Sequence, residues 1–295
     1  MGRKKSENAL EKVKKEREKK VWTADELLQK GRFDLTLTEQ RFIIYVISKI
    51  QPTDEVFEKY TFKLSDFQKV CGIHEDESYT KLKRILLELK SKNWWILIDD
   101  PDAPGKKCES LVSWFEVVRI SRNIGKITVK FNEDMMPFLL KLAENREKGK
   151  GYFTFFEMKY ILPMRSQYSI RLYSLLKSYQ KNNTEWYFGI EELKRLLDCL
   201  NYERYTDMRR FVLDPATKEI NRFSDLNISY DVEKDGKKVD KITFFMEEKT
   251  IDEKMEAQRT GLTQLDGQIH WWDGGLEEIL ADRKKIKAEC KQRSN

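Results

Sequence analysis

The sequence predicts an α+β fold of two tandem winged-helix domains, each a helix-turn-helix followed by a β-hairpin wing, related by internal duplication. The first observation is a direct repeat: residues 79–88 (YTKLKRILLE) return 126 residues later as 205–214 (YTDMRRFVLD). At the same offset, residues 62–67 (FKLSDF) return as 188–193 (FGIEEL). Each copy reads as a short apolar strand, a helix, a loop and a second helix with basic residues near its start, which is the order of a helix-turn-helix.

Length and composition set the class of protein. The 295 residues suit two domains of about 100 to 150 residues, each able to bury its own core. A chain with 36% charged and 40% hydrophobic residues is typical of a soluble globular protein. No apolar run approaches the roughly 18 residues of a membrane span, and the charged N-terminus excludes a secretory signal. We therefore expect a cytoplasmic protein that does not enter a membrane.

The net charge of +6 is not spread along the chain. Residues 1–20 carry nine Lys/Arg and four Glu, which gives +5, and residues 250–295 carry eight against nine acidic residues, which gives −1. Residues 21–249 therefore total only +2. A nearly neutral body binds DNA only where its cations gather on one face, so the helix patterns must decide.

The first predicted domain covers residues 30–147, after a charged N-terminal arm over 1–29 that we expect to be flexible. Its core helix follows Thr38, which we expect as the N-cap. A strand at 60–64 leads to a helix capped by Ser65 and ended by Gly72, and Ser78 caps the second helix. The apolar stripe of that second helix has helical spacing, and its outer face carries the candidate DNA contacts. These candidates are Tyr79, Lys81, Lys83 and Arg84.

A wing is predicted directly after this helix. Two β-rich runs, 94–98 and 111–120, flank residues 101–107 (PDAPGKK), which have turn composition. A third strand at 126–131 is expected to complete or extend the same small sheet. Lys106 and Lys107 lie near the tip, where they could contact phosphates, although exposed lysines at a tip also serve solubility.

The second predicted domain covers residues 148–249 and follows a linker-like run at 145–151 (NREKGKG). It repeats the order with a core helix at 166–180, a strand at 185–188, a helix at 189–199 and a basic helix starting near Thr206. Its wing pairs 227–232 with 239–247 around Asp235-Gly236, a strong hairpin signal. Residues 250–295 form a C-terminal tail, in which Leu276 to Ile286 mark an amphipathic helix.

The basic helix of the second domain is the main candidate for base contacts. At 100° per residue, one polar sector faces away from the apolar Met208, Phe211, Val212 and Ile220. Such polar side chains reach guanine, adenine and phosphate oxygens in the major groove. A solvated helix face is the alternative interpretation, but the duplication and the following wing favour DNA. The polar sector contains Asp207, Arg210, Asp214, Thr217, Lys218 and Asn221, with Arg209 beside it.

Pro215 interrupts this helix, because proline lacks a backbone donor and clashes with the preceding turn. Either the helix bends there, or Asp214 caps a second helical segment that has Pro215 at its first position. Both alternatives keep Arg209 and Arg210 on the N-terminal part.

Further phosphate contacts are predicted at a helix start and at the second wing. Arg165 and Ser166 precede the second core helix, where free N–H groups and the helix dipole favour an anion. Ser166 as an ordinary cap is the alternative. Lys237 and Lys238 lie at the second wing tip.

No residue pattern indicates an enzyme. The sequence lacks the GxxxxGK[ST] loop of an ATP-driven helicase or loader. A rolling-circle nicking enzyme needs clustered histidines, but His74 and His270 are the only two and lie far apart. The four cysteines (Cys71, Cys108, Cys199 and Cys290) include no CxxC pair, so neither disulfides nor a zinc site is expected. No cofactor or metal is predicted.

Three segments of this chain resemble the iteron-binding initiator proteins of theta-replicating plasmids, a family with two winged-helix domains. They are residues 37–41 (LTEQR), 166–176 (SQYSIRLYSLL) and above all 211–221 (FVLDPATKEIN), and the resemblance covers residues 30–249. The residues that it places against DNA are Thr206, Asp207, Arg209, Arg210, Lys218 and Arg222.

The resemblance implies an initiator that binds tandem repeats in double-stranded DNA at a plasmid origin, promotes opening of the adjacent AT-rich duplex and recruits host proteins. Those partners would be a host replication initiator, a helicase or a helicase loader. It also implies a homodimer in equilibrium with a monomer, the dimer acting as an autorepressor. The alternative is a winged-helix transcriptional regulator without an initiation role.

Overall fold

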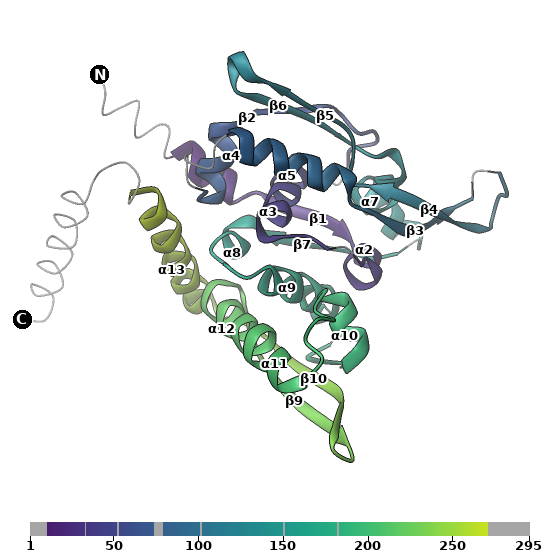
Figure 1. Ribbon diagram of the computed structural model, residues 1–295, viewed down its shortest axis with the longest axis vertical. Helices are drawn as coiled ribbons and strands as arrows, with labels where there is room; N and C mark the ends of the chain where they lie inside the picture. The colour runs from purple at the N-terminus through teal and green to yellow at the C-terminus, as the bar shows by residue number, and fades with distance from the viewer. Residues whose placement is uncertain are drawn as a thin grey trace, which may run out of the picture.

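The computed structural model describes residues 11–270 except residues 33, 52, 74–78, 101, 150 and 182, and omits the side chains of residues 79, 81 and 266–270. The first half of the chain (purple to blue) lies above the second half (green to yellow) in Figure 1. Each half contains a helix-turn-helix and an antiparallel three-stranded sheet. The predicted α+β class with two winged helices is confirmed.

The first unit is built around α3 (Leu37–Ile47), whose apolar residues are almost all buried. A sheet of order β2-β6-β5 covers one side of the core, and Phe42 lies at the centre with its ring 5.3 Å from that of Phe67 and 5.8 Å from that of Phe115. The other elements of this unit are β2 (Tyr60–Lys63), α4 (Leu64–Cys71), α5 (Tyr79–Ser91), β5 (Phe115–Ser121) and β6 (Lys126–Phe131).

The second unit repeats this arrangement around α9 (Gln167–Gln180), with a sheet of order β8-β10-β9. Ser166 is the N-cap of α9, since its hydroxyl accepts from the N–H of Tyr168 at 3.2 Å. The other elements are β8 (Glu185–Gly189), α10 (Ile190–Leu196), α11 (Tyr205–Met208), the π-helical segment η3 (Arg209–Leu213), α12 (Asp214–Phe223), β9 (Leu226–Asp235) and β10 (Lys238–Glu248).

The spacing of the sequence repeat is also the spacing of the elements. Helices α4 and α10 begin at residues 64 and 190, and α5 and α11 begin at 79 and 205, so both pairs are 126 residues apart. The later strands β5 and β9 begin at 115 and 226, which are only 111 apart. The first unit is longer here because an extra hairpin lies between its second helix and its sheet.

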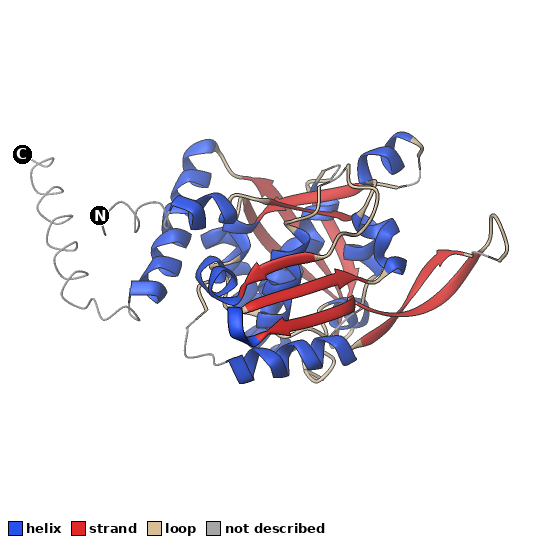
Figure 2. Ribbon diagram, turned by 90° about the horizontal axis from the view of Figure 1, so that it is seen from above, coloured by secondary structure: helices blue, strands red, loops and turns tan. Residues whose placement is uncertain are grey.

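This extra hairpin corrects the predicted first wing. Strands β3 (Asn93–Asp99) and β4 (Lys107–Ser113) pair as expected, but they form a separate two-stranded sheet that extends from the body (Figure 2). The buried Trp114 separates β4 from β5, so the expected single strand 111–120 is wrong. Strand β6 does not join the hairpin; it pairs with β5 and β2. By topology, the counterpart of the second wing is therefore β5–β6.

The expectation of a flexible arm over residues 1–29 is wrong for its described part. Residues 11–17 are helical, and β1 (Lys20–Ala24) pairs antiparallel with β7 (Phe153–Glu157) before α2 (Asp25–Lys30) begins. Arg17 is buried and its guanidinium donates to the carbonyl oxygens of Lys69 and Val70, both at 3.0 Å, at the end of α4. A cation that satisfies helix-terminal carbonyls anchors this segment to the first unit.

The β1–β7 pair crosses the predicted boundary at residues 145–151. Strand β1 contacts α3, while β7 contacts α9, and one hydrophobic cluster runs through both units. The division at residues 147 and 148 remains a prediction. The short helix η1 (Arg122–Ile124) joins β5 to β6, and η2 (Glu133–Met135), α6 (Met136–Leu139) and α7 (Leu142–Glu147) fill the segment between β6 and β7.

Two buried arginines bind backbone carbonyls of the opposite half. Arg41 on α3 donates through Nη2 to the oxygens of Leu162 and Met164, both at 2.8 Å. Arg171 on α9 donates through Nη2 to the oxygen of Gly31 at 2.5 Å. Burial lowers the pKa of Arg171 to about 10, so it still carries its charge at neutral pH. These reciprocal contacts help to fix α3 and α9 relative to each other.

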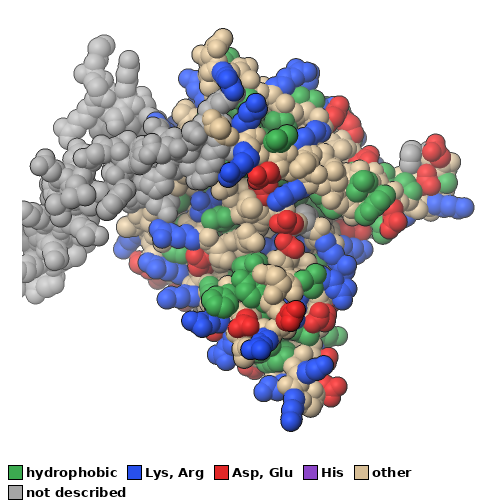
Figure 3. Space-filling view, viewed as in Figure 1, with side chains coloured by type: hydrophobic (Ala, Val, Ile, Leu, Met, Phe, Trp, Pro, Cys, Tyr) green, Lys and Arg blue, Asp and Glu red, His purple; other side chains and the backbone are tan. Residues whose placement is uncertain are grey.

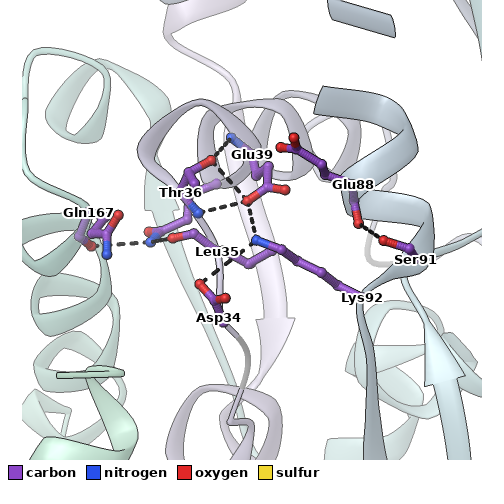
Figure 4. A network of polar contacts seen from close by, with 9 residues as sticks. Asp34, Leu35, Thr36, Glu39, Glu88, Ser91, Lys92 and Gln167 are labelled. Carbon is purple, nitrogen blue, oxygen red and sulfur yellow. Dashed lines mark hydrogen bonds and ion pairs between the residues drawn. The ribbon is translucent and has the colours of Figure 1, made fainter. Parts of the chain in front are cut away.

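A polar network at the start of α3 corrects the predicted N-cap (Figure 4). Thr36, rather than Thr38, caps the helix, because it forms a capping box with Glu39 three residues later. Glu39 Oε2 accepts from the N–H of Thr36 at 2.7 Å and from Lys92 Nζ at 2.7 Å. Gln40 donates to the carbonyl of Gln167 at 3.3 Å, so the network reaches the start of α9.

The other predicted caps have mixed outcomes. Helix α4 begins at Leu64 after Lys63, so the prediction of Ser65 as its cap is wrong. Gly72 ends α4 in the left-handed region with φ of 62°, as expected. Ser78 lies outside the described residues.

After β10, the chain forms α13 (Ile251–His270), which packs against α12 and α8 (Met158–Ile161). Gln264 Nε2 donates to the carbonyl of Pro163 at 2.7 Å, and Leu265 is buried. A Cβ on Gly261 would lie 2.7 Å from Cγ of Pro163, so glycine permits this close approach. The amphipathic helix predicted from Leu276 lies outside the described residues.

Candidate nucleic-acid interface

The helix predicted to contact bases is continuous from Tyr205 to Phe223, through α11, η3 and α12. Within η3 the turn is wide, since the N–H of Asp214 donates to the carbonyl of Arg209, five residues earlier. An α-turn would press the Pro215 ring against the carbonyl of Phe211. The wide turn avoids that clash. Of the two predicted alternatives, the cap is wrong because Asp214 has helical backbone angles, and the proline is accommodated by a π-helical turn.

The wide turn changes which residues face outward. Met208, Val212 and Ile220 are buried as predicted, but Phe211 is 48% exposed. One extra residue in a turn rotates the preceding part of the helix by about 100° relative to the following part. A helical wheel with constant spacing therefore fails across η3, and the prediction that Phe211 faces the core is wrong.

Asn221 has a structural role that the wheel did not show. Its Nδ2 donates to the carbonyl of Ile228 at 2.9 Å, and its Oδ1 accepts from the N–H of Ile228 at 2.7 Å. Both ends of the amide therefore hold α12 against β9. That Asn221 also contacts DNA stays a prediction.

Arg209 and the wing are connected through Asp214. Asp214 accepts from the Tyr230 hydroxyl on β9 at 2.5 Å and from Arg209 Nε at 3.3 Å. The Asp214 carboxylate raises the pKa of Arg209 above its ordinary value. Arg209 is exposed but already paired, so it would have to leave this carboxylate to bind a phosphate.

The start of α9 already holds an anion supplied by the protein. The carboxylate of Glu219 on α12 accepts from the N–H groups of Arg165 at 3.0 Å and Ser166 at 3.1 Å. These two N–H groups are among those expected to bind phosphate and are here occupied by Glu219, so the DNA contact of Arg165 and Ser166 stays a prediction. The contact with Glu219 joins α12 to α9. The Arg165 side chain remains exposed beside it.

Several exposed cations of the second unit lie on α12, its preceding turn and the wing. Figure 3 shows Lys and Arg side chains along the edge of the molecule that carries α13, α12 and the β9–β10 hairpin. Arg210, Lys218 and Arg222 are exposed, and none has an acidic partner among the described residues. Thr206 is exposed and Asp207 partly buried on α11. The wing lysines, Lys237 and Lys238, are exposed around the turn at Gly236.

In the first unit, Lys83 and Arg84 are exposed on α5, and Arg84 Nε lies 3.5 Å from Glu88. The side chains of Tyr79 and Lys81 lie outside the described part. Lys106 and Lys107 are at the end of the β3–β4 hairpin, where Lys107 pairs with Asp99 at 2.8 Å. The structure therefore separates these two lysines from the β5–β6 strands that occupy the wing position.

The sequence did not predict the roles of Tyr230 and Glu219, whose contacts hold the helix Tyr205–Phe223 against β9 and α9. Pro215 was the one available signal, because it marks the turn around which these contacts are arranged. Over the described residues, no group of three His, Cys, Asp or Glu side chains could hold a metal, and Cys71, Cys108 and Cys199 are free thiols. None of the described helices is long and apolar enough to cross a membrane.

The fold and the exposed cations define a class: a tandem winged-helix protein of the kind that presents a helix to the major groove. The chain belongs to the initiator replication protein family. The family models described as "Initiator Replication protein, WH1" and "Initiator Rep protein, WH2" match residues 21–177 and 189–246.

Two relatives agree with this assignment. A replication initiation protein from Escherichia coli is 24% identical over 247 residues, which covers 80% of this chain and 71% of that protein. The crystal structure of Pi initiator protein in complex with iteron DNA superposes with a TM-score of 0.62 at 20% identity, covering 79% of this chain and 99% of that one. The likeness to the second supports the fold.

Proposed function

We propose that this chain is a non-enzymatic, sequence-specific duplex DNA-binding protein that initiates plasmid replication at tandem repeats of its origin. The observation that carries the proposal is the exposed set Arg210, Lys218 and Arg222, beside a lysine-tipped wing. These three residues lie on the continuous helix Tyr205–Phe223 of the second unit, which we call the recognition helix. Guanidinium and ammonium groups without acidic partners are available to base edges and phosphates. Family membership and the fold of an initiator seen with iteron DNA support the same function.

Footprinting of the purified protein on its own replicon, at two salt concentrations, tests this function. We expect several evenly spaced protections next to an AT-rich stretch, weaker at the higher salt because bound phosphates release counterions. A single protected operator would instead favour the winged-helix transcriptional regulator. Absence of salt-sensitive protection anywhere would contradict both. Recruitment of a host initiator, helicase or helicase loader, and repression of the chain's own gene, are parts of the proposal that follow from the family.

We also propose that the chain forms a homodimer in equilibrium with a monomer, through the β3–β4 hairpin. Trp95 and Leu111 are cross-strand partners on this hairpin and are 63% and 55% exposed, and Leu97 is also exposed. An apolar face on a two-stranded sheet with unpaired edges favours association with a second copy.

Trp95→Glu should weaken the dimer by at least about tenfold, because an exposed tryptophan at the centre of an interface is a typical hot spot. Sedimentation equilibrium of the full chain measures this dissociation constant. Tyr152→Glu, at an aromatic residue that is 65% exposed outside the hairpin, is the matched control and should leave the constant unchanged. If Trp95→Glu and Tyr152→Glu had the same dimer dissociation constant, the hairpin would be rejected as the dimer surface.

A further inference from the structure

Phe211 is the one large apolar side chain exposed on the recognition helix among the described residues. We propose that its ring contacts a thymine methyl group in the major groove and thereby sets part of the sequence preference. This inference rests on the proposed duplex DNA function and deepens it. It adds an apolar contact to the polar contacts with base edges and phosphates that are proposed for Arg210 and Lys218.

The exposure of Phe211 follows from the helix geometry. Its neighbours Met208, Val212 and Leu213 are fully buried, while Phe211 is turned outward by the wide turn of η3. That turn accommodates Pro215, so the same feature that interrupts the sequence pattern also presents the ring. Short π-helical turns are rare and are frequent at functional sites.

The ring is also held in place. Phe211 stacks on Tyr202, with centroids 5.9 Å apart and an interplanar angle of 24°. Tyr202 in turn meets the edge of Tyr168 at 6.3 Å, at the start of α9. A ring stacked on a second ring that is itself packed against a third loses little conformational freedom when it binds, which favours a contact that discriminates between ligands.

The surroundings of the ring indicate what it would bind. The Arg210 guanidinium lies 5.1 Å from the ring centroid. Lys218 is exposed further along the same helix. A partner for this surface must therefore offer both negative charge and a small apolar group. Duplex DNA offers phosphates together with the C5-methyl of thymine, which is the only methyl group of the four unmodified bases in the major groove.

Replacement of thymidine by deoxyuridine tests this contact, because it removes only that methyl group. The probe is a duplex that carries one protected repeat from the chain's own replicon, with uracil substituted at one thymine position at a time. Fluorescence anisotropy gives the dissociation constant for the full-length protein and for Phe211→Ala. At one or two positions, uracil should weaken binding of the unsubstituted protein about fourfold, the value of one buried methyl group.

For the Phe211→Ala variant, uracil at those positions should not weaken binding further, since the methyl group no longer has the ring as its partner. Tyr187→Ala is the matched control: Tyr187 is 61% exposed on β8, away from the recognition helix, and this variant should keep the fourfold response. Equal uracil effects in the unsubstituted and Phe211→Ala proteins, or no effect at any position, would overturn the proposal.

Failure of this inference can be told apart from failure of the proposed function. If Phe211 does not contact thymine, the protein still prefers its own repeat over random duplex at moderate salt. If the proposed function is wrong, no such preference exists for any duplex. A urea denaturation curve confirms that Phe211→Ala is folded, and Phe211→Leu should restore part of the response because it restores an apolar contact.

Discussion

Replacement of Lys92 by methionine should lower the free energy of unfolding by about 2 to 3 kcal/mol, because it leaves a buried carboxylate without its cation. The Glu39 side chain is 0% exposed, and Lys92 Nζ lies 2.7 Å from its Oε2. Loss of one partner from a fully buried ion pair costs about 3 to 5 kcal/mol. We expect about 2 to 3 kcal/mol for Lys92→Met because Lys92 is 26% exposed. Urea denaturation of the full chain measures the change.

A second substitution separates the ion pair from packing. The double variant Lys92→Met with Glu39→Gln should recover most of the loss, since removing both charges removes the unpaired one. Lys83→Met is the control: the same change at an exposed position on α5 should alter stability by less than about 0.5 kcal/mol. A loss for Lys92→Met no larger than for Lys83→Met would contradict the role assigned to the network in Figure 4.

Arg210→Ala should weaken binding to the protein's own repeat by about 1 to 3 kcal/mol, the usual value of an arginine contact to a base edge. Arg210 is exposed on the recognition helix and has no acidic partner among the described residues, so its guanidinium is available. Dissociation constants measured at two salt concentrations, on the repeat and on random duplex, give both the size and the specificity of the effect.

Arg209→Ala is the matched control for this prediction. The Arg209 guanidinium is paired with Asp214, which in turn binds Tyr230. Breaking this pair would offset part of the binding free energy that Arg209 gains from any contact with DNA. We therefore expect a smaller loss than for Arg210→Ala. An equal loss on repeat and random DNA for Arg210→Ala would show a phosphate contact instead of a base contact, and no loss on either would remove Arg210 from the interface.

Most of the helices and strands could be predicted because local signals and burial agree. The repeat places α4 and α10, and α5 and α11, in one register, and Asp235-Gly236 marks the turn between β9 and β10. The errors occur where a second residue or segment nearby carries the same local signal. Thr36 caps α3 in place of Thr38 because Glu39 completes its capping box. The first wing was misplaced because an inserted hairpin has the same composition as a wing.

The candidate site was predictable as a set of residues on one helix, but less so residue by residue. Arg210 and Lys218 are exposed where the helical pattern placed them, and Thr206 and Arg222, which the family resemblance placed against DNA, are exposed as well. Asn221 and the N–H group of Ser166 also form contacts within the protein, with Ile228 and Glu219 respectively, which the pattern did not predict. No sequence pattern distinguishes an amide that faces DNA from one that faces a neighbouring strand.

The sequence by itself determined the duplication, the order of elements and the choice of basic helix, because these depend on periodicity and turn residues over short stretches. Only the tertiary structure decided which way Phe211 faces, which anion occupies the start of α9, and how α3 and α9 are joined through Arg41 and Arg171. The physical reason is that each of these depends on a partner more than 20 residues away or on the phase of a helix. That phase changes when one extra residue enters the turn before Pro215.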